Sequence, residues 1–140
     1  MNTLVVNILL VFFALNSFGQ DELIRTENYK PVNLEDAVAQ LQFLHPDSVQ
    51  AKIKTMSEDE FTGNAHMGMG MWIRNNWKLW GNGKLGKYFN SIGIYHPDDM
   101  SGIILTSYYR ELKGIEWQVE EQVKVYQKYW DEIKEREKDE

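Results

Sequence analysis

The sequence predicts an all-α fold: a single compact domain of about five or six short helices, followed by a longer amphipathic helix at the C-terminus. Three observations support this class. Apolar residues recur at spacings of three and four, which is the period of a helix with one buried face. Helix-capping residues, Gly and Pro separate the periodic segments. The 140 residues are 43% hydrophobic and 26% charged, which is the balance of a globular protein.

The N-terminal segment is predicted to be a secretory signal peptide, residues 1–19. Its apolar run, residues 4–15, suits a signal sequence and is shorter than the roughly 20 residues of a membrane-spanning helix. Ser17 and Gly19 supply the small side chains expected before cleavage after Gly19. No Lys or Arg precedes the run, so an uncleaved anchor remains the alternative. Residues 20–30 are polar and predict a flexible leader. We therefore expect an exported protein, periplasmic or secreted.

Charge and cysteine content exclude several classes of function. The formal net charge is −6 and the pI is about 5.1, which disfavours binding to nucleic acid or to an anionic membrane surface. The chain contains no cysteine, so disulfides, thiolate chemistry and lipidation at a cysteine are absent. We expect no cofactor, no membrane association after signal cleavage, and a monomer or weak oligomer.

The first half of the helical domain, which we place at residues 31–114, carries three helix starts. Asn33 is the expected N-cap of the first helix. Residues 45–48, "HPDS", end that helix and start a second, and residues 57–61, "SEDEF", cap a third with an acidic turn. Residues 62–64, "TGN", predict a break in the chain. The expected inward residues of the first two helices are Ala37, Val38, Leu41, Leu44, Val49, Ile53 and Met56.

The second half begins with residues 81–86, "GNGKLG", the clearest loop signal in the chain. A short helical turn follows, and residues 91–99 are expected to be extended or looping. Another helix is predicted for residues 100–112, with Gly114 ending it. The tripeptide "HPD" occurs ahead of two predicted helices, and in each its Asp is expected to act as the cap.

Residues 115–140 predict an amphipathic helix with a charged tail. Its apolar stripe steps by three and four residues, with Glu and Lys on the opposite face. The simplest interpretation is a helix that closes the core, and the alternative is one that docks on a partner. The stripe consists of Val119, Val123, Tyr126, Trp130 and Ile133.

The most unusual segment is residues 66–80, "HMGMGMWIRNNWKLW". On one helix His66, Gly70, Arg74 and Trp77 form a stripe, with spacings of four, four and three. Each interior Gly costs about 1 kcal/mol relative to Ala, so both glycines predict close approach of another backbone or a ligand. The simplest structural explanation is a tight helix crossing, with the tryptophans in the core and Arg74 paired with a carboxylate.

Two chemical alternatives remain open for this segment. A histidine with thioethers is a soft ligand set for Cu(I), and His66, Met67, Met69 and Met71 supply it only if the segment is extended or looped. A hydrolase-like enzyme is the other, with His66 or His96 as general base and Arg74 as anion clamp. No G-x-S-x-G elbow supports catalysis, so an enzyme is the less favoured hypothesis.

The motif H-x-G-x-G-x-x-I-R-N-x-W-x-L-W, then a Gly-containing loop, L-x-x-Y-F and H-P-D-D-M-S-x-I-I-L, resembles that of a bacterial family, domain of unknown function 6794. The resemblance covers roughly residues 31–114. It implies no activity, and the three methionines fall outside the motif. The matching positions are His66, Gly68, Gly70, Ile73, Arg74, Asn75, Trp77, Leu79, Trp80, Tyr88, Phe89, His96, Pro97, Asp98, Asp99, Met100 and Ser101.

These observations favour a binding or interaction module whose partner is an unknown protein or a small polar ligand. The helix of residues 66–80 is expected to pack against the loop of residues 96–101. If Arg74 is buried against Asp98 or Asp99 with no cavity beside it, both the binding and the enzyme hypotheses fail for this segment, and it is structural. The candidate binding residues are His66, Arg74, Asn75, Trp77, Trp80, His96, Asp98, Asp99 and Ser101.

Overall fold

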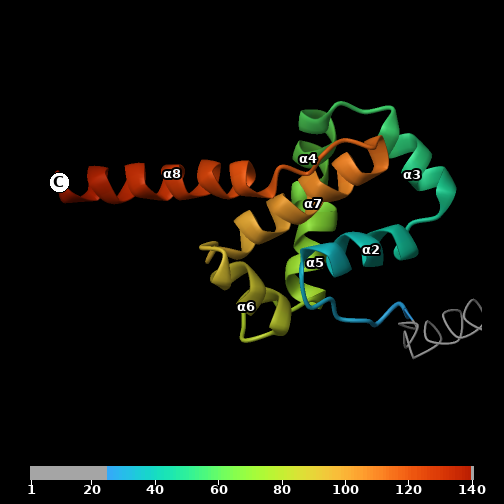
Figure 1. The fold of residues 1–140 in the computed structure, drawn as a ribbon, viewed down its shortest axis with the longest axis horizontal. Helices are drawn as coiled ribbons and strands as arrows, with labels where there is room; N and C mark the ends of the chain where they lie inside the picture. Colours follow the sequence, from blue (N-terminus) through green and yellow to red (C-terminus); the bar gives the residue numbers. More distant parts are fainter. Residues whose placement is uncertain (1–24, 140) are drawn as a thin grey trace, which may run out of the picture.

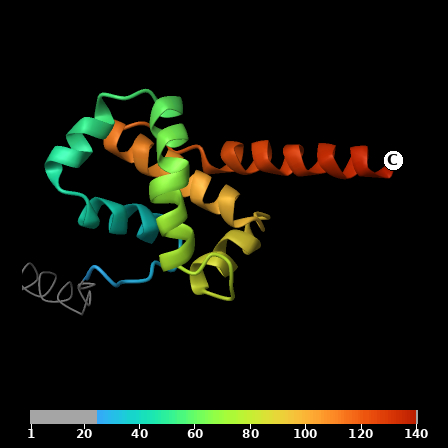
Figure 2. The ribbon, with the colours of Figure 1, turned by 180° about the vertical axis from the view of Figure 1, so that it is seen from behind.

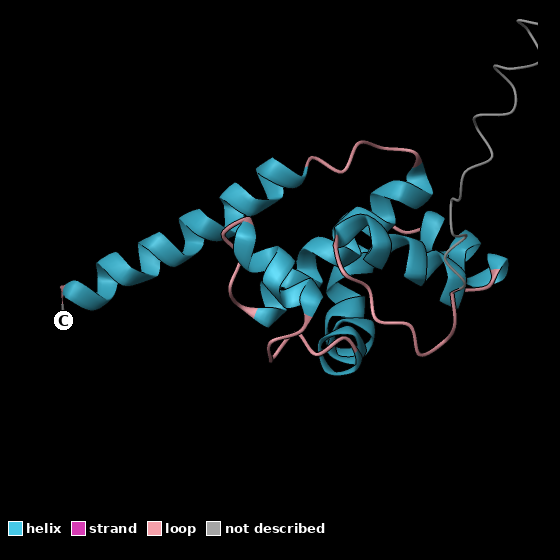
Figure 3. Cartoon of the chain, turned by 60° about the horizontal axis from the view of Figure 1, so that its bottom comes forward, coloured by secondary structure: helices cyan, strands magenta, loops and turns pink. Residues whose placement is uncertain are grey.

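The computed structural model describes residues 25–139, which form helices joined by loops, with no strand in that range (Figure 3). The predicted all-α class is therefore confirmed. The predicted signal peptide and residues 20–24 of the leader lie outside the described residues. In chain order the elements are α2 (Leu34–Leu44), α3 (Asp47–Lys54), α4 (Glu58–Ala65), the π-helical turn η1 (His66–Gly70), α5 (Met71–Asn76), α6 (Lys84–Ser91), α7 (Pro97–Lys113) and α8 (Val119–Lys138).

Helix α7 is the centre of the fold and contacts every other described helix (Figure 1). Its sequence explains this position, because apolar residues fall on several of its faces rather than on one stripe. Gly114 ends it in the left-handed conformation, φ 67°, as expected for a C-terminal glycine. The buried apolar residues of α7 are Pro97, Met100, Ile103, Ile104, Leu105, Tyr108, Tyr109 and Leu112.

Helix α4, turn η1 and helix α5 form one continuous rod that crosses α7 (Figure 2). The predicted break at residues 62–64 is therefore wrong. Gly63 lies inside α4 and does not have a positive φ, so this glycine makes no turn. Phe61 and Ala65, one turn apart on its two sides, are both buried. Their burial against the core outweighs the roughly 1 kcal/mol helix penalty of one glycine.

Both "HPD" tripeptides do start helices, but the aspartates are not the caps. The N-caps are Pro46 for α3 and His96 for α7, and each Asp lies within the first turn. At α7 the Nδ1 atom of His96 accepts a hydrogen bond from the backbone N–H of Asp98, at 3.2 Å. Pro97 occupies the first helical position, which proline favours, so α7 begins three residues earlier than predicted. Asn33 caps α2 as expected.

Part of the segment predicted as a leader lies against α2. Arg25 forms an ion pair with Asp36 at 2.7 Å, and the Tyr29 hydroxyl donates to the same carboxylate at 2.7 Å. The Gln40 side-chain amide donates to the Thr26 carbonyl at 2.8 Å. Residues 25–30 are thus held by side-chain hydrogen bonds to the start of the domain.

Helix α8 projects from the body of the protein, with the C-terminus at its far end (Figures 1 and 2). Val123 is its one buried residue, and the other members of the predicted apolar stripe are only partly covered. The prediction that α8 closes the core therefore holds only near Val123. Within residues 25–139, no helix has both the length and the apolar character needed to cross a membrane.

Candidate functional site

The Arg74 side chain is the centre of a buried polar network between α5 and α7. It is only 4% exposed. Its Nε lies 3.0 Å from Asp98 Oδ1, and its Nη1 donates to Ser101 Oγ at 2.8 Å. Its Nη2 donates to the His66 carbonyl at 3.3 Å. Since all three guanidinium nitrogens are engaged, the network joins the π-helical turn to the first turns of α7.

Gly70 makes room for this network. A Cβ at that position would lie 3.0 Å from Arg74 Nη1, 3.4 Å from the Ala65 carbonyl and 3.5 Å from Leu105 Cδ1. The predicted close approach is therefore confirmed at Gly70. At Gly68 it is wrong, because a Cβ there would meet nothing within 4 Å.

The structure distributes the remaining predicted residues of this segment differently. His66 enters the network only through its backbone, and its side chain and that of Asn75 are exposed. Trp77 is buried, but Trp72 and Trp80 are 38% and 62% exposed, so the prediction that the tryptophans form core is wrong for these two. The helix ends before Trp77 and Lys78 has a positive φ of 55°, which breaks the helical spacing on which the prediction for Trp80 depended.

The methionine segment does not meet the condition set by the copper hypothesis. Residues His66–Gly70 form a π-helical turn rather than an extended strand or loop. Met67 and Met71 are 64% and 41% exposed, whereas Met69 packs against the core. In the part of the chain that the structure describes, no group of three or more His, Asp or Glu side chains is placed to hold a metal ion.

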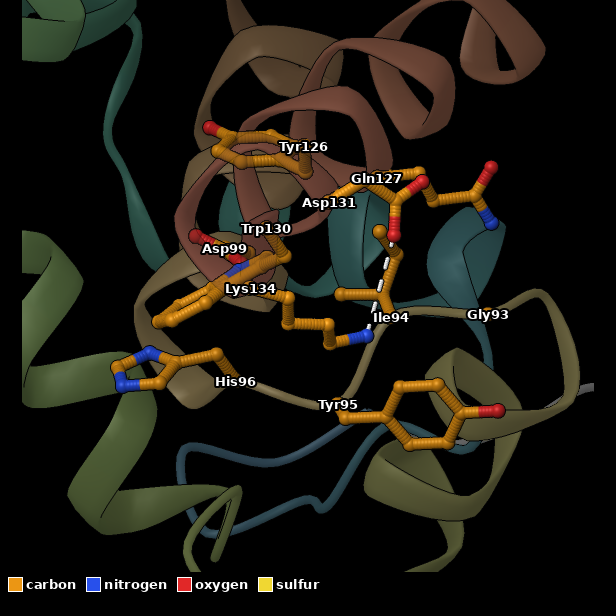
Figure 4. A pocket seen from close by; sticks show the side chains of 10 residues that line it. All are labelled: Gly93, Ile94, Tyr95, His96, Asp99, Tyr126, Gln127, Trp130, Asp131 and Lys134. Carbon is orange, nitrogen blue, oxygen red and sulfur yellow. Dashed lines mark hydrogen bonds and ion pairs between the residues drawn. The ribbon is translucent and has the colours of Figure 1, made fainter. Parts of the chain in front are cut away.

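A cleft of about 580 Å³ lies on the other side of the α7 N-terminus, between residues 93–99 and α8 (Figure 4). One wall consists of residues 93–96, which link α6 to α7, and residues 97–99 in the first turn of α7; α8 supplies the opposite wall. The lining residues are Gly93, Ile94, Tyr95, His96, Asp99, Tyr126, Gln127, Trp130, Asp131 and Lys134.

His96 is held at this cleft by two tryptophans. Its ring stacks on Trp130 of α8, with centroids 5.4 Å apart and planes at 28°. Trp80 approaches at 6.3 Å in an edge arrangement, at 73°. Because Nδ1 accepts the N–H of Asp98, the neutral ring carries its proton on Nε2.

Asp99 lies beside His96 and is also held by α8. Its Oδ2 atom accepts a hydrogen bond of 2.7 Å from the Trp130 indole N–H. Burial raises the pKa of the Asp99 carboxyl, and the hydrogen bond from Trp130 and the nearby His96 partly oppose that rise. The cleft therefore contains a carboxylate that is partly removed from water.

Two glycines allow α8 to approach closely enough to form the cleft. A Cβ at Gly102 would collide with the Tyr126 hydroxyl, and a Cβ at Gly93 would collide with the side-chain amide of Gln127. Gly93 also has a positive φ of 85°, a conformation that favours glycine. The absence of a side chain at these positions brings two consecutive residues of α8 against the domain.

Sequence analysis identified His96 and Asp99 but missed the other wall of the cleft. The missed residues lie mainly on α8, where Tyr126 and Trp130 were assigned only to an apolar stripe. Both side chains combine a large ring with a polar group, which suits a partly exposed site better than a core. That combination was the available signal. No comparable sequence signal distinguishes the other missed residues from ordinary surface residues; these are Tyr95, Gln127, Asp131 and Lys134.

These features define a small all-α domain with a central helix, a buried arginine network and an adjoining cleft. The family described as "Domain of unknown function (DUF6794)" matches residues 30–112, more than half of the chain. The protein belongs to this family, as the resemblance implied. No curated protein and no solved structure matches the chain. Residues 93–99 fall within the matched range, whereas α8 falls outside it. One wall of the cleft therefore belongs to the family domain, and the other wall belongs to the helix that follows it.

Proposed function

We propose that the protein is an exported binding module whose ligand site is the cleft between residues 93–99 and α8. The observation that carries this proposal is the shape and lining of the cleft: about 580 Å³, with aromatic rings beside a few polar groups. That volume and that mixture are typical of small-ligand sites. The ligand class of the proposal is a small polar molecule or a side chain of a protein partner.

The buried arginine network supports the site without taking part in binding. Arg74 holds Asp98 and Ser101, which fix the first turns of α7. The same turn carries His96 and Asp99 into the cleft. In this proposal the Arg74 network is therefore a scaffold. Asp98 belongs to the scaffold, and the next residue, Asp99, belongs to the ligand site.

Binding is favoured over hydrolysis by the state of the arginine. An anion clamp needs free guanidinium donors facing a substrate. Arg74 is 4% exposed and each of its nitrogens already contacts a protein group. The cleft is lined by other residues, with Lys134 as its cation, and this cation lies 3.8 Å from Asp131.

The site is tested by NMR on the ¹⁵N-labelled protein with three probes of different charge: n-butylamine, butyrate and phenol. We expect at least one probe to shift the indole N–H signal of Trp130 and the amide of Gly93 in a saturable manner. The matched reporter is the indole of Trp72, which is 38% exposed on α5 and does not line the cleft. If no probe moves Trp130 more than Trp72, the proposed site is wrong.

The export part of the proposal rests on residues 1–19, which lie outside the described residues. Intact mass spectrometry of the protein expressed with its full N-terminus tests it. We expect a mature chain that begins at Gln20 and is released from membranes by osmotic shock or into the medium. A full-length chain that remains with the membrane fraction supports the uncleaved anchor instead.

A further inference from the structure

The charges at the cleft do not balance. Of the two neighbouring aspartates, Asp98 forms an ion pair with Arg74 at 3.0 Å. On α8, Asp131 and Lys134 face each other at 3.8 Å (Figure 4). Asp99 has no ion pair among the described residues, where the Trp130 indole is its hydrogen-bond donor. One carboxylate in the cleft is thus left without a cation.

A single indole N–H is a weak substitute for the water that Asp99 has lost. It engages only Oδ2, and burial of the carboxyl disfavours the charged form. A cation placed at Oδ1 supplies the missing electrostatic stabilisation, and its attraction is stronger there than in open water because the surroundings are partly desolvated. The geometry therefore favours a positively charged ligand over a neutral or negative one.

The walls of the cleft suit the same ligand. The rings of Trp130 and Tyr126 lie beside Asp99 (Figure 4). Faces of aromatic rings attract cations, and the indole face does so most strongly. Tyr95, which is 74% exposed, lies at the outer edge of the cleft and its ring points away from Asp99 (Figure 4). A net charge of −6 also attracts cations toward the protein.

We propose that the cleft binds an organic ammonium group carried on an apolar stem, with the Asp99 carboxylate as its counter-ion and the rings of Trp130 and Tyr126 beside it. This inference rests on the proposed function of the cleft and deepens it by naming the ligand class. A bare metal ion fits less well, because the described residues offer no cluster of three acidic or His side chains. The ammonium group belongs either to a small amine or to a lysine side chain of a partner.

The test is a calorimetric titration of the full mature chain with matched probes. Nα-acetyl-lysine methylamide carries the ammonium group, and Nα-acetyl-norleucine methylamide has a similar stem without charge. We expect the lysine compound to bind at least about ten-fold tighter. In a second arm, a nine-residue peptide with a central lysine is compared with its norleucine counterpart. Tighter binding of the lysine peptide than of the lysine amide identifies a protein partner, and the reverse identifies a free amine.

The variant Asp99→Asn removes the charge while its amide oxygen still accepts from Trp130. We expect it to weaken binding of the lysine compound at least about ten-fold. Glu132→Gln is the matched control, since it makes the same charge change on α8 at a residue that faces Lys128 and lies outside the cleft. We expect it to change affinity less than about two-fold. Thermal unfolding of both variants verifies that they are folded.

Three results overturn the inference. These are equal binding of the lysine and norleucine compounds, unchanged binding by Asp99→Asn, and binding of neither compound. If butyrate or phenol nevertheless shifts Trp130 in the NMR experiment, the cleft remains a ligand site and only the cation assignment fails. If no probe shifts Trp130, the proposed function fails with it.

Discussion

Asp98 and Asp99 are adjacent in the chain but lie in two different environments. Asp98 faces α5 and pairs with Arg74, a side chain that is 4% exposed. Asp99 faces α8 and accepts a hydrogen bond from Trp130 at the edge of a cleft. Consecutive helical residues point about 100° apart, so a single turn of α7 directs Asp98 toward α5 and Asp99 toward α8.

The difference between the two aspartates shows that the α5 side of this turn is packed closed and the α8 side is open to solvent. On the α5 side the polar groups satisfy one another, and Gly70 lets them close together. On the α8 side, Gly93 and Gly102 also permit close approach, but the helix then diverges from the body and leaves the cleft open. The α5 side stabilises this turn, and on the α8 side the same turn borders the open cleft.

The largest effect is expected on the α5 side, for Arg74→Ala. This change leaves Asp98 without its cation and removes two further hydrogen bonds. We expect the free energy of unfolding to fall by about 3 kcal/mol, measured by urea denaturation. His66→Ala is the control: its side chain is exposed and only its carbonyl is used, so we expect a loss below about 0.5 kcal/mol. Equal losses would show that the His66 side chain belongs to the network.

The two glycines of the π-helical turn form a second pair. Gly70→Ala places a methyl group 3.0 Å from Arg74 Nη1, and this nitrogen is held in place by its hydrogen bond to Ser101. We expect it to destabilise the protein by about 2 kcal/mol. Gly68→Ala meets open space and gains helix propensity, so we expect it to stabilise by up to about 1 kcal/mol. Thermal unfolding of both variants decides this; stabilisation by Gly70→Ala would mean that the network adapts to the added methyl group.

Replacing each aspartate with asparagine in turn measures what Asp98 contributes on the α5 side and what Asp99 contributes on the α8 side. Asp98→Asn breaks the ion pair with Arg74, and because Asp98 is 40% exposed we expect a loss of only about 1 kcal/mol. For Asp99, burial raises the pKa above its ordinary value of 3.8. Its stabilising contribution is therefore present below that ordinary value and is lost as the pH rises through the raised folded pKa.

Asp99→Asn removes this pH dependence. We expect the stability of the variant relative to the natural protein to increase as the pH is raised from about 4 to about 7. Urea denaturation of the variant and the natural protein at several pH values measures the difference. A stability difference that falls over this range would show that Asp99 is better stabilised as an anion than its surroundings indicate.

A similarly small effect is expected at the contact between α7 and α8. Gly102→Ala forces the Tyr126 hydroxyl away from α7, although alanine is the better helix former. We expect a loss of about 1 kcal/mol and a shift of the Trp130 indole signal as the helix moves. Tyr126→Phe removes the colliding oxygen, so the double variant is expected to recover most of that shift. An unchanged Trp130 signal in Gly102→Ala would show that α8 tolerates the methyl group in place.

Much of the helical domain was predictable because local features set it. Asn33 as a cap and Gly114 as a helix end each depend on backbone conformation that a few neighbouring residues determine. The loop predicted for residues 81–86 is shorter than expected, because α6 already begins at Lys84. The break at residues 62–64 was mispredicted, because burial of Phe61 and Ala65 outweighs the local preference of Gly63. The buried pairing of Arg74 with an aspartate was also predictable, since a buried cation requires a partner.

The sequence by itself determined the all-α class, the family, the cap at Asn33, the helix end at Gly114 and the pairing of Arg74 with an aspartate. Only the tertiary structure decided which aspartate Arg74 takes, which glycine is crowded, and that α8 diverges to leave a cleft beside Asp99. Local signals act over one or two helical turns. The direction of a carboxylate and the angle of a departing helix depend on contacts between segments that are distant in the chain, such as Asp99 with Trp130 and Gly102 with Tyr126.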